Sequence, residues 1–149
     1  MNILVSACLL GTNCKYNGGN NFTPKLLELK RENNIIPVCP EELGGLLTPR
    51  EPCEIQEGSG KEVLEGKSRV INKIGEDVTA DFIKGAGKTL ALAKQHNCRL
   101  AVLRSGSPSC GCGIIYDGTF SGMLKEGNGV TAQLLLDNKI VVMTEKDFE

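Results

Sequence analysis

The sequence is poor in the residues that most often mark nucleic-acid binding or histidine-based metal chemistry. Its 149 residues include one histidine and no tryptophan, and aromatic residues make up 4%. Single-stranded nucleic acid is usually bound on aromatic platforms within a basic groove, whereas the 17 basic residues here are scattered and are balanced by 18 acidic ones. We therefore expect no nucleic-acid partner and a small molecule as substrate.

Long apolar runs are also missing from the sequence. No segment approaches the ~20 residues of a membrane-spanning helix. The stretch Val5-Ser6-Ala7-Cys8 looks like a lipoprotein cleavage box, but no Lys or Arg and only a few apolar residues precede it. The sequence therefore predicts a cytoplasmic protein with no membrane partner.

Cysteine, by contrast, is abundant. Seven cysteines are present, an odd number, and a chain of this length can bury a core without disulfide staples. Where thiols stay reduced, a group of cysteines is more typical of metal binding or catalysis than of a disulfide framework. Thiol chemistry is therefore the leading hypothesis for the site.

Short apolar runs alternate with helical patterns along the chain, which predicts parallel strands joined by helices. The expected strands are residues 3–8, 35–39, 100–103 and 140–143, and the expected helices are 24–33, 79–97 (capped by Thr79) and 130–138. Residues 61–64 and 69–74 are expected to pair as a small antiparallel hairpin after a structured loop over 41–60. The fold class is thus α/β: one compact, three-layer, Rossmann-like domain over residues 1–149, with a mostly parallel sheet of about four strands.

Three cysteines fall where predicted strands end. Cys8 ends the first strand, Cys39 ends the second, and Cys110 lies in the loop that leaves the third. Because ligands of an open parallel sheet bind beyond the carboxyl ends of its strands, these thiols should meet at one edge. Three thiolates with little histidine favour an iron–sulfur cluster or zinc.

The cysteine spacing leaves the kind of metal site open. Structural zinc usually uses a C-x(2–4)-C pair, and the closest pair here, Cys110 with Cys112, is only C-x-C. A cluster with three cysteine ligands keeps one iron open, as a Lewis-acid catalyst requires. Cys98 is expected to pack in the core, whereas Cys14, Cys53 or Cys112 could add a fourth ligand. A closed cluster or zinc site would instead indicate a non-catalytic metal-binding protein for structure, sensing or electron transfer.

Several segments together resemble one bacterial family. They read VSACLLG at residues 5–11, PVCPE at 37–41, GL at 45–46 followed by PR at 49–50, SPSCG at 107–111 and YDG at 116–118. The family was long labelled a domain of unknown function and includes thiouracil desulfidases that carry a 4Fe-4S cluster. The resemblance covers essentially the whole chain. It implies an enzyme that hydrolyses the C–S bond of a thiolated pyrimidine or similar thiocarbonyl compound, without redox change, and releases hydrosulfide.

The resemblance also implies roles for individual residues. The 4Fe-4S cluster would be held by Cys8, Cys39 and Cys110, and catalysis would be assisted by Glu41 and Ser107. A carboxylate can activate water or move a proton, and a hydroxyl can donate a hydrogen bond or relay a proton. Glu42 is the nearest competitor for the carboxylate role. Asn17 and Gly106 depart from the family pattern, and the departures bear on which substrate is used.

Overall fold

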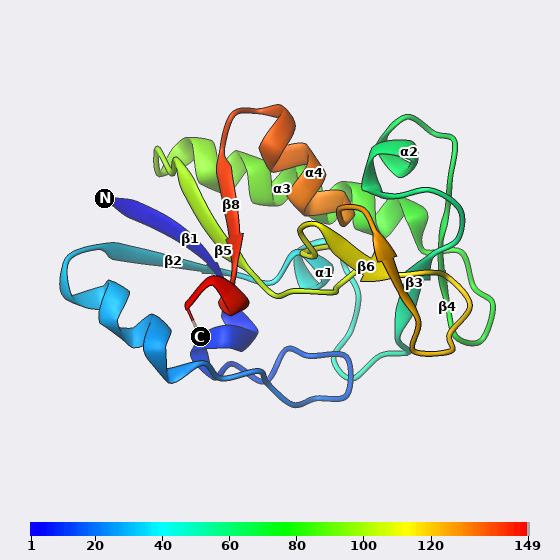
Figure 1. Ribbon diagram of the computed structural model, residues 1–149, viewed down its shortest axis with the longest axis horizontal. Coiled ribbons are helices and arrows are strands. Elements are labelled where there is room, and N and C mark those ends of the chain that lie inside the picture. Colours follow the sequence, from blue (N-terminus) through cyan, green and yellow to red (C-terminus); the bar gives the residue numbers. More distant parts are fainter. Residues whose placement is uncertain (149) are drawn as a thin grey trace.

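A four-stranded parallel sheet forms the centre of the computed structural model, which describes residues 1–148 (Figure 1). The strands lie in the order β2-β1-β5-β8, and every neighbouring pair is parallel. Their bounds are β1 (Asn2–Ser6), β2 (Asn34–Val38), β5 (Leu100–Leu103) and β8 (Val141–Thr144). This arrangement confirms the predicted α/β class and the mostly parallel sheet of about four strands.

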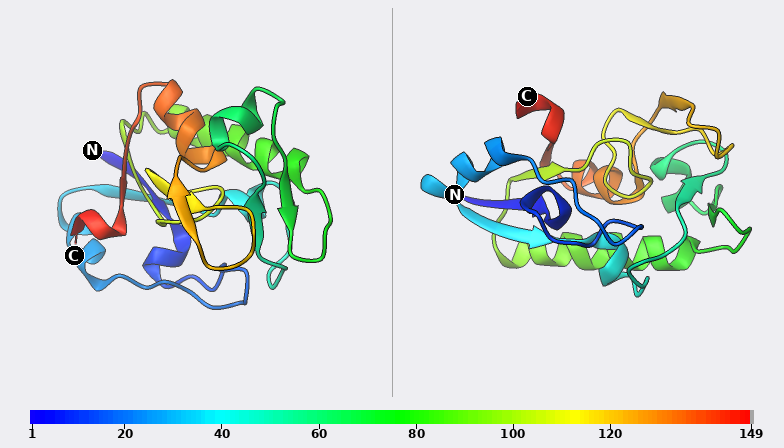
Figure 2. Two further views of the ribbon diagram at one scale, coloured as in Figure 1. Left: turned by 45° about the vertical axis from the view of Figure 1, so that its right-hand side comes forward. Right: turned by 90° about the horizontal axis from the view of Figure 1, so that it is seen from below.

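Helices cover both faces of the sheet, which gives three layers. One side carries α3 (Thr79–Gln95) and α4 (Val130–Asp137), and the other carries the 3₁₀ helices η1 (Ala7–Leu10), η2 (Pro24–Arg31) and η3 (Glu145–Phe148) (Figure 2). Side chains of a strand alternate between faces. Leu4 of β1 is therefore buried on the α3–α4 side, whereas Ile3 and Val5 are buried on the 3₁₀ side.

Two short antiparallel pairs and two short helices complete the fold. Strand β3 (Cys53–Ile55) pairs with β4 (Val70–Asn72), and β6 (Ile114–Tyr116) pairs with β7 (Leu124–Glu126). The helices are α1 (Pro40–Leu43) and α2 (Gly60–Leu64). Ile55, Val70 and Ile115 of the small sheets share a second apolar core with Phe82 of α3. No helix within residues 1–148 is long and apolar enough to cross a membrane.

Some expected elements were wrong. Residues 61–64 are helical rather than extended, because Ser59 and Glu62 form a capping box in which the Ser59 amide donates to Glu62 Oε1 at 2.7 Å. Strand β4 consequently pairs with β3, which lies within the region expected to be a loop. The helix expected from residue 24 is a 3₁₀ helix. Thr79 does not cap α3; its hydroxyl accepts the Val70 amide proton at 2.9 Å.

Candidate functional site

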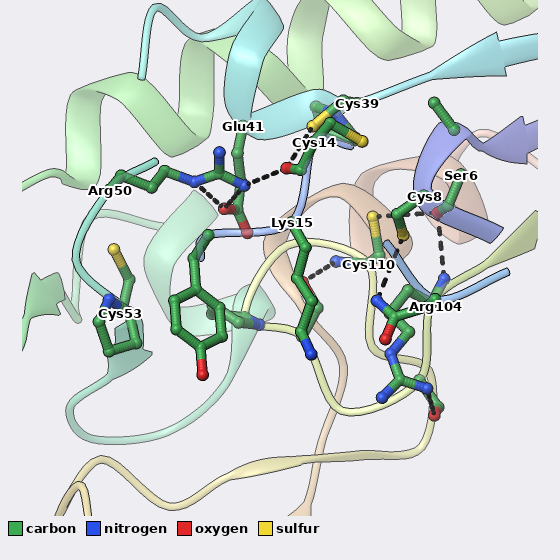
Figure 3. A pocket seen from close by; sticks show the side chains of 18 of the residues that line it. Ser6, Cys8, Cys14, Lys15, Cys39, Glu41, Arg50, Cys53, Arg104 and Cys110 are labelled. Atoms are coloured by element: carbon green, nitrogen blue, oxygen red, sulfur yellow. Dashed lines mark hydrogen bonds and ion pairs between the residues drawn. The ribbon is translucent and has the colours of Figure 1, made fainter. Parts of the chain in front are cut away.

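A cavity of about 320 Å³ lies beyond the carboxyl ends of β1, β2 and β5 (Figure 3). This volume is at the lower end of the range for small-molecule sites. All five site residues named from the sequence line it: Cys8, Cys39, Glu41, Ser107 and Cys110. The structure therefore brings together side chains from three distant parts of the chain.

The other cysteines divide into two groups. Cys14 and Cys53 also line the cavity. Cys98 and Cys112 instead belong to the core between the sheet and its two long helices, where Cys98 is buried as expected. Of the three cysteines considered as a fourth ligand, Cys112 thus lies away from the cavity.

The pairing register of β1 with β2 brings Cys8 and Cys39 to the same edge of the sheet. Strand β1 ends at Ser6 rather than at Cys8, because the chain turns there into η1, which carries the cysteine over the strand end. Ser6 is paired with Val38 of β2, so the next residue, Cys39, leaves the sheet at the same level. Both thiols consequently reach the same edge.

Close backbone packing fixes the segment after Cys39. Helix α1 begins at Pro40 and rests on α3. A Cβ atom added at Gly85 of α3 would lie 2.0 Å from the Pro40 carbonyl oxygen, and one at Gly44 would lie equally close to a carbonyl of α3. Glycine at both positions allows this approach. The contact places Glu41 beside Cys39 at the cavity wall.

The start of α4 holds the third cysteine. The first amides of a helix lack partners within the helix. In α4, the Val130 amide donates to the Pro108 carbonyl at 2.8 Å, and the Thr131 amide donates to the Ser109 carbonyl at 2.9 Å. These bonds anchor the loop that carries Cys110, which is 5% exposed.

Ser107 shapes the same loop through its side chain. Its Oγ accepts the amide protons of Ser109 and Cys110, each at 3.0 Å. Both bonds use the oxygen as an acceptor, so the hydroxyl proton of Ser107 stays available to another acceptor. The residue thus combines a structural role with a free donor at the cavity wall.

Each of the three strand-end cysteines receives a hydrogen bond at sulfur. The donors are Ser6 Oγ for Cys110 (3.5 Å), Asn21 Nδ2 for Cys8 (3.6 Å) and the Glu42 amide for Cys39. Such donors stabilise sulfur in its anionic, metal-binding form. The thiol of Cys39 also donates to the Cys14 carbonyl at 3.8 Å, and those of Cys53 and Cys112 likewise donate to backbone carbonyls.

The Cys14 side chain is hydrogen-bonded to the sulfurs of Cys8 and Cys39. Its hydrogen bond to Cys8, together with that from Asn21, lowers the pKa of Cys8 to about 7, although burial opposes the shift. The bond from Cys14 also lowers the pKa of Cys39, and the Glu42 amide adds to that effect. The pKa of Cys14 itself is raised by these same bonds. Among Cys8, Cys14 and Cys39, Cys14 is therefore the one that keeps its proton.

Cys110 and Cys53 are protonated for another reason. Burial raises the pKa of Cys110 well above its ordinary value, and the bond from Ser6 only partly offsets this. Burial also raises the pKa of Cys53 to about 12, with the negative charge of Glu41 adding to the effect. The cavity thus holds two sulfurs that ionise easily, those of Cys8 and Cys39, and three that do not.

Glu41 is held by Arg50 at the cavity wall. The two side chains are 15% and 9% exposed and form an ion pair at 2.7 Å. Arg50 also donates to the Cys14 carbonyl at 2.9 Å, which ties the Cys14 loop to α1. Glu42, the competing carboxylate, is exposed and accepts the Thr48 hydroxyl proton at 2.5 Å. The structure therefore favours Glu41 as the carboxylate that faces the cavity.

Sequence reasoning missed several residues at the cavity wall. Ser6, Asn21 and Arg104 line it, and Arg104 is paired with the buried Glu145 of η3 at 2.5 Å. Ser6 and Arg104 are polar residues at the carboxyl ends of β1 and β5, a position that could have singled them out. Asn21 lies in a loop whose path the sequence does not fix.

The cysteines of the cavity suit a cluster in which each thiolate binds a different iron atom. Within residues 1–148, no three histidine, cysteine or acidic side chains converge tightly enough to share a single metal ion. In a 4Fe-4S cluster each thiolate binds a different iron, so the ligands need to surround a space rather than meet at a point. Cys8, Cys39 and Cys110 each line the cavity, from three different segments of the chain.

The fold and the cavity define a Rossmann-like α/β protein with a thiol-lined site at the carboxyl edge of its parallel sheet. The profile of the family described as 2-thiouracil desulfurase matches residues 3–147. The chain belongs to this family, as the sequence resemblance predicted.

Two relatives match almost the whole chain. "Uncharacterized protein YbbK" of Bacillus subtilis (strain 168) is 48% identical over 145 residues, which span 97% of this chain and 96% of YbbK. The solved structure of TudS, a 4Fe-4S-dependent thiouracil desulfidase, is 40% identical, with a TM-score of 0.86. The match covers 98% of this chain and 91% of TudS, and it confirms the fold.

Proposed function

We propose that this protein is a 4Fe-4S-dependent desulfidase acting on a small thiocarbonyl compound such as 2-thiouracil. In this reaction water supplies the oxygen of the product, the sulfur leaves as hydrosulfide, and no net electron transfer occurs. The observation that carries the proposal is the meeting of Cys8, Cys39 and Cys110 around one cavity with Glu41 at its wall. Family membership and the similarity to TudS support it.

The three strand-end cysteines would hold the cluster. When bound, a cluster with three thiolate ligands supplies an open iron that acts as a Lewis acid toward the substrate's sulfur. The hydrogen bonds from Ser6, Asn21 and the Glu42 amide stabilise the ligands as thiolates. All seven cysteines are free, and a reducing cytoplasm, the compartment we propose, would keep them so.

Glu41 would handle the proton of the attacking water. Its Oε2 is engaged by Arg50, which prevents the carboxylate from turning away from the cavity. Its Oε1 can then accept a proton from water as the oxygen attacks the thiocarbonyl carbon, and can return that proton to a leaving group. Arg50 orients the carboxylate and is not itself required to contact the substrate.

Ser107 would orient the substrate. Two backbone amides already donate to its oxygen, so the hydroxyl proton points elsewhere. A carbonyl or ring nitrogen of a thiolated pyrimidine is a suitable acceptor. The rigid loop at the start of α4 would hold this donor at a constant position relative to Cys110.

Anaerobic reconstitution with iron and sulfide tests the proposal. We expect cluster absorbance, and sulfide release from 2-thiouracil, with the wild-type protein. Cys8→Ala, Cys39→Ala and Cys110→Ala should each lose the cluster, whereas Cys112→Ala, whose cysteine lies outside the cavity, should keep it. Retention of normal iron by the three cavity variants would overturn the ligand assignment. A loaded wild-type protein that releases no sulfide from thiocarbonyl compounds would overturn the activity.

A further inference from the structure

The Ser6 hydroxyl lies at the junction of the sheet and the cavity. Ser6 is the last residue of β1 and is 2% exposed. Its Oγ accepts the amide proton of Arg104 at 3.0 Å and lies 3.5 Å from Cys110 Sγ. Because the Ser6 oxygen already accepts the Arg104 amide proton, the hydroxyl proton of Ser6 is directed at the Cys110 sulfur.

The amide that orients Ser6 is itself held firmly. Arg104 pairs through its side chain with Glu145, and the Ser105 amide donates to the same carboxylate at 2.6 Å. Glu145 is 2% exposed, so this anchor is buried. The direction of the Ser6 hydroxyl is therefore set by a backbone amide, and the segment that carries this amide is anchored on the buried Glu145 carboxylate.

Cys110 depends on this one donor more than the other two cysteines depend on theirs. Cys8 and Cys39 both contact Cys14 in addition to their own donors. Within residues 1–148, Ser6 is the one side chain that donates to Cys110 Sγ. A buried anionic sulfur without a donor is strongly disfavoured.

We propose that Ser6 is a positioning residue that orients the Cys110 thiolate and tunes the charge this ligand shares with a bound cluster. The inference rests on the proposed function, because it takes Cys110 as a ligand. A hydrogen bond to a cluster thiolate favours the more negative, reduced state and so raises the reduction potential. The same withdrawal of charge makes the irons stronger Lewis acids toward a substrate's sulfur.

The test is a redox titration of anaerobically reconstituted protein, followed by electron paramagnetic resonance. For Ser6→Ala we expect an about tenfold shift of the equilibrium toward the oxidised cluster, the size of one hydrogen bond to a charged group. That shift equals a midpoint about 59 mV more negative for one electron. Ser6→Thr keeps the hydroxyl and should restore the midpoint.

Ser109→Ala is the matched control. Ser109 is next to Cys110 in sequence and 1% exposed, but its hydroxyl pairs with Thr131 at 2.8 Å and not with a sulfur. The control should keep the wild-type midpoint. A Ser6→Ala protein that has native circular dichroism but retains less iron than Ser109→Ala would equally support the role.

An unchanged midpoint and iron content in Ser6→Ala would overturn the inference while leaving the proposed function intact. An equal shift in Ser109→Ala would also overturn it, because general loosening of the Cys110 loop would then explain both results. Failure of the wild-type protein to bind any cluster would instead overturn the proposed function.

Discussion

Arg50 pairs with a single oxygen of Glu41: its Nε–H donates to Oε2 at 2.7 Å, and its Nη2 atom lies at the same distance from that oxygen. The other oxygen, Oε1, accepts no hydrogen bond from any residue between 1 and 148. A fork-to-fork pair would have engaged both oxygens. This one-sided pairing anchors the carboxylate and leaves half of it for water or substrate.

Replacing Glu41 by Gln should abolish most turnover without loss of the cluster. The amide keeps the size of the side chain but cannot accept a proton from water at neutral pH. Removal of a general base typically lowers kcat by about 10²–10⁴-fold. Sulfide release and iron content are the measurements, and Glu42→Gln, on the exposed side of α1, is the control that should retain activity. A Glu41→Gln enzyme within threefold of wild type would rule out this role.

Arg50→Met should lower kcat by about tenfold or more while the iron content stays normal. Without the guanidinium, Glu41 loses its anchor and its Oε1 no longer faces the cavity in a fixed orientation. Arg50→Lys should recover part of the rate, because an ammonium can pair with Oε2 but cannot reproduce the planar fork. Steady-state kinetics measures kcat and KM separately, and we expect the substitution to lower kcat more than it changes KM. A change confined to KM would contradict a role through Glu41.

Cys8 should be the most readily alkylated of the buried and half-buried thiols in cluster-free protein. The thiolate is the reacting form, and the pKa of Cys8 is lowered to about 7 from an ordinary 9.0. Its labelling rate should therefore rise as the pH passes about 7 and fall below it. Cys53, with its pKa raised to about 12, should stay slow throughout the neutral range. Timed iodoacetamide labelling with peptide mass spectrometry gives both rates.

The unfolded protein is the control for this labelling experiment. In denaturant both thiols should react with the same pH midpoint, near the ordinary value of 9.0. A midpoint near 9 for Cys8 in the folded protein would show that the bonds from Cys14 and Asn21 do not stabilise its thiolate.

Alanine substitutions at two glycines of α3 should change the free energy of unfolding in opposite directions. At Gly85 the new Cβ would lie 2.0 Å from the Pro40 carbonyl oxygen, so the helices must separate, and we expect a loss of about 1–3 kcal/mol in the free energy of unfolding. At Gly87 no atom lies within 4 Å, and alanine should stabilise the helix by about 0.5–1 kcal/mol. Urea unfolding measures both. Equal effects at the two sites would contradict the close packing of α1 on α3.

Much of the site geometry follows from the sequence by way of the sheet. Residues 100–103 were predicted as a strand and form β5, because a short apolar run flanked by polar turns has few alternatives. Once the strands are parallel, their carboxyl ends share an edge, and the cysteines that follow them meet there. The parallel sheet thus brings these cysteines to the edge at which the cavity lies.

Other features depend on tertiary contacts that sequence patterns do not encode. Residues 61–64 carry too few apolar positions to distinguish a strand from a helix turn, although the capping pair Ser59 and Glu62 was a usable signal. The hairpin of β6 and β7 was missed because its three-residue strands leave one face exposed. The pairing of Glu41 with Arg50 depends on the path of the loop between them.

The three strand-end cysteines, at positions 8, 39 and 110, belong to segments that meet only after β2, β1 and β5 have paired. A nascent chain has no such meeting point until residue 110 has left the ribosome and the third strand has docked. On the proposed function, a cluster held by all three cysteines would therefore be completed only after these strands have paired. Iron and sulfide would then have to reach Cys8, Cys39 and Cys110 by way of the cavity that these residues line.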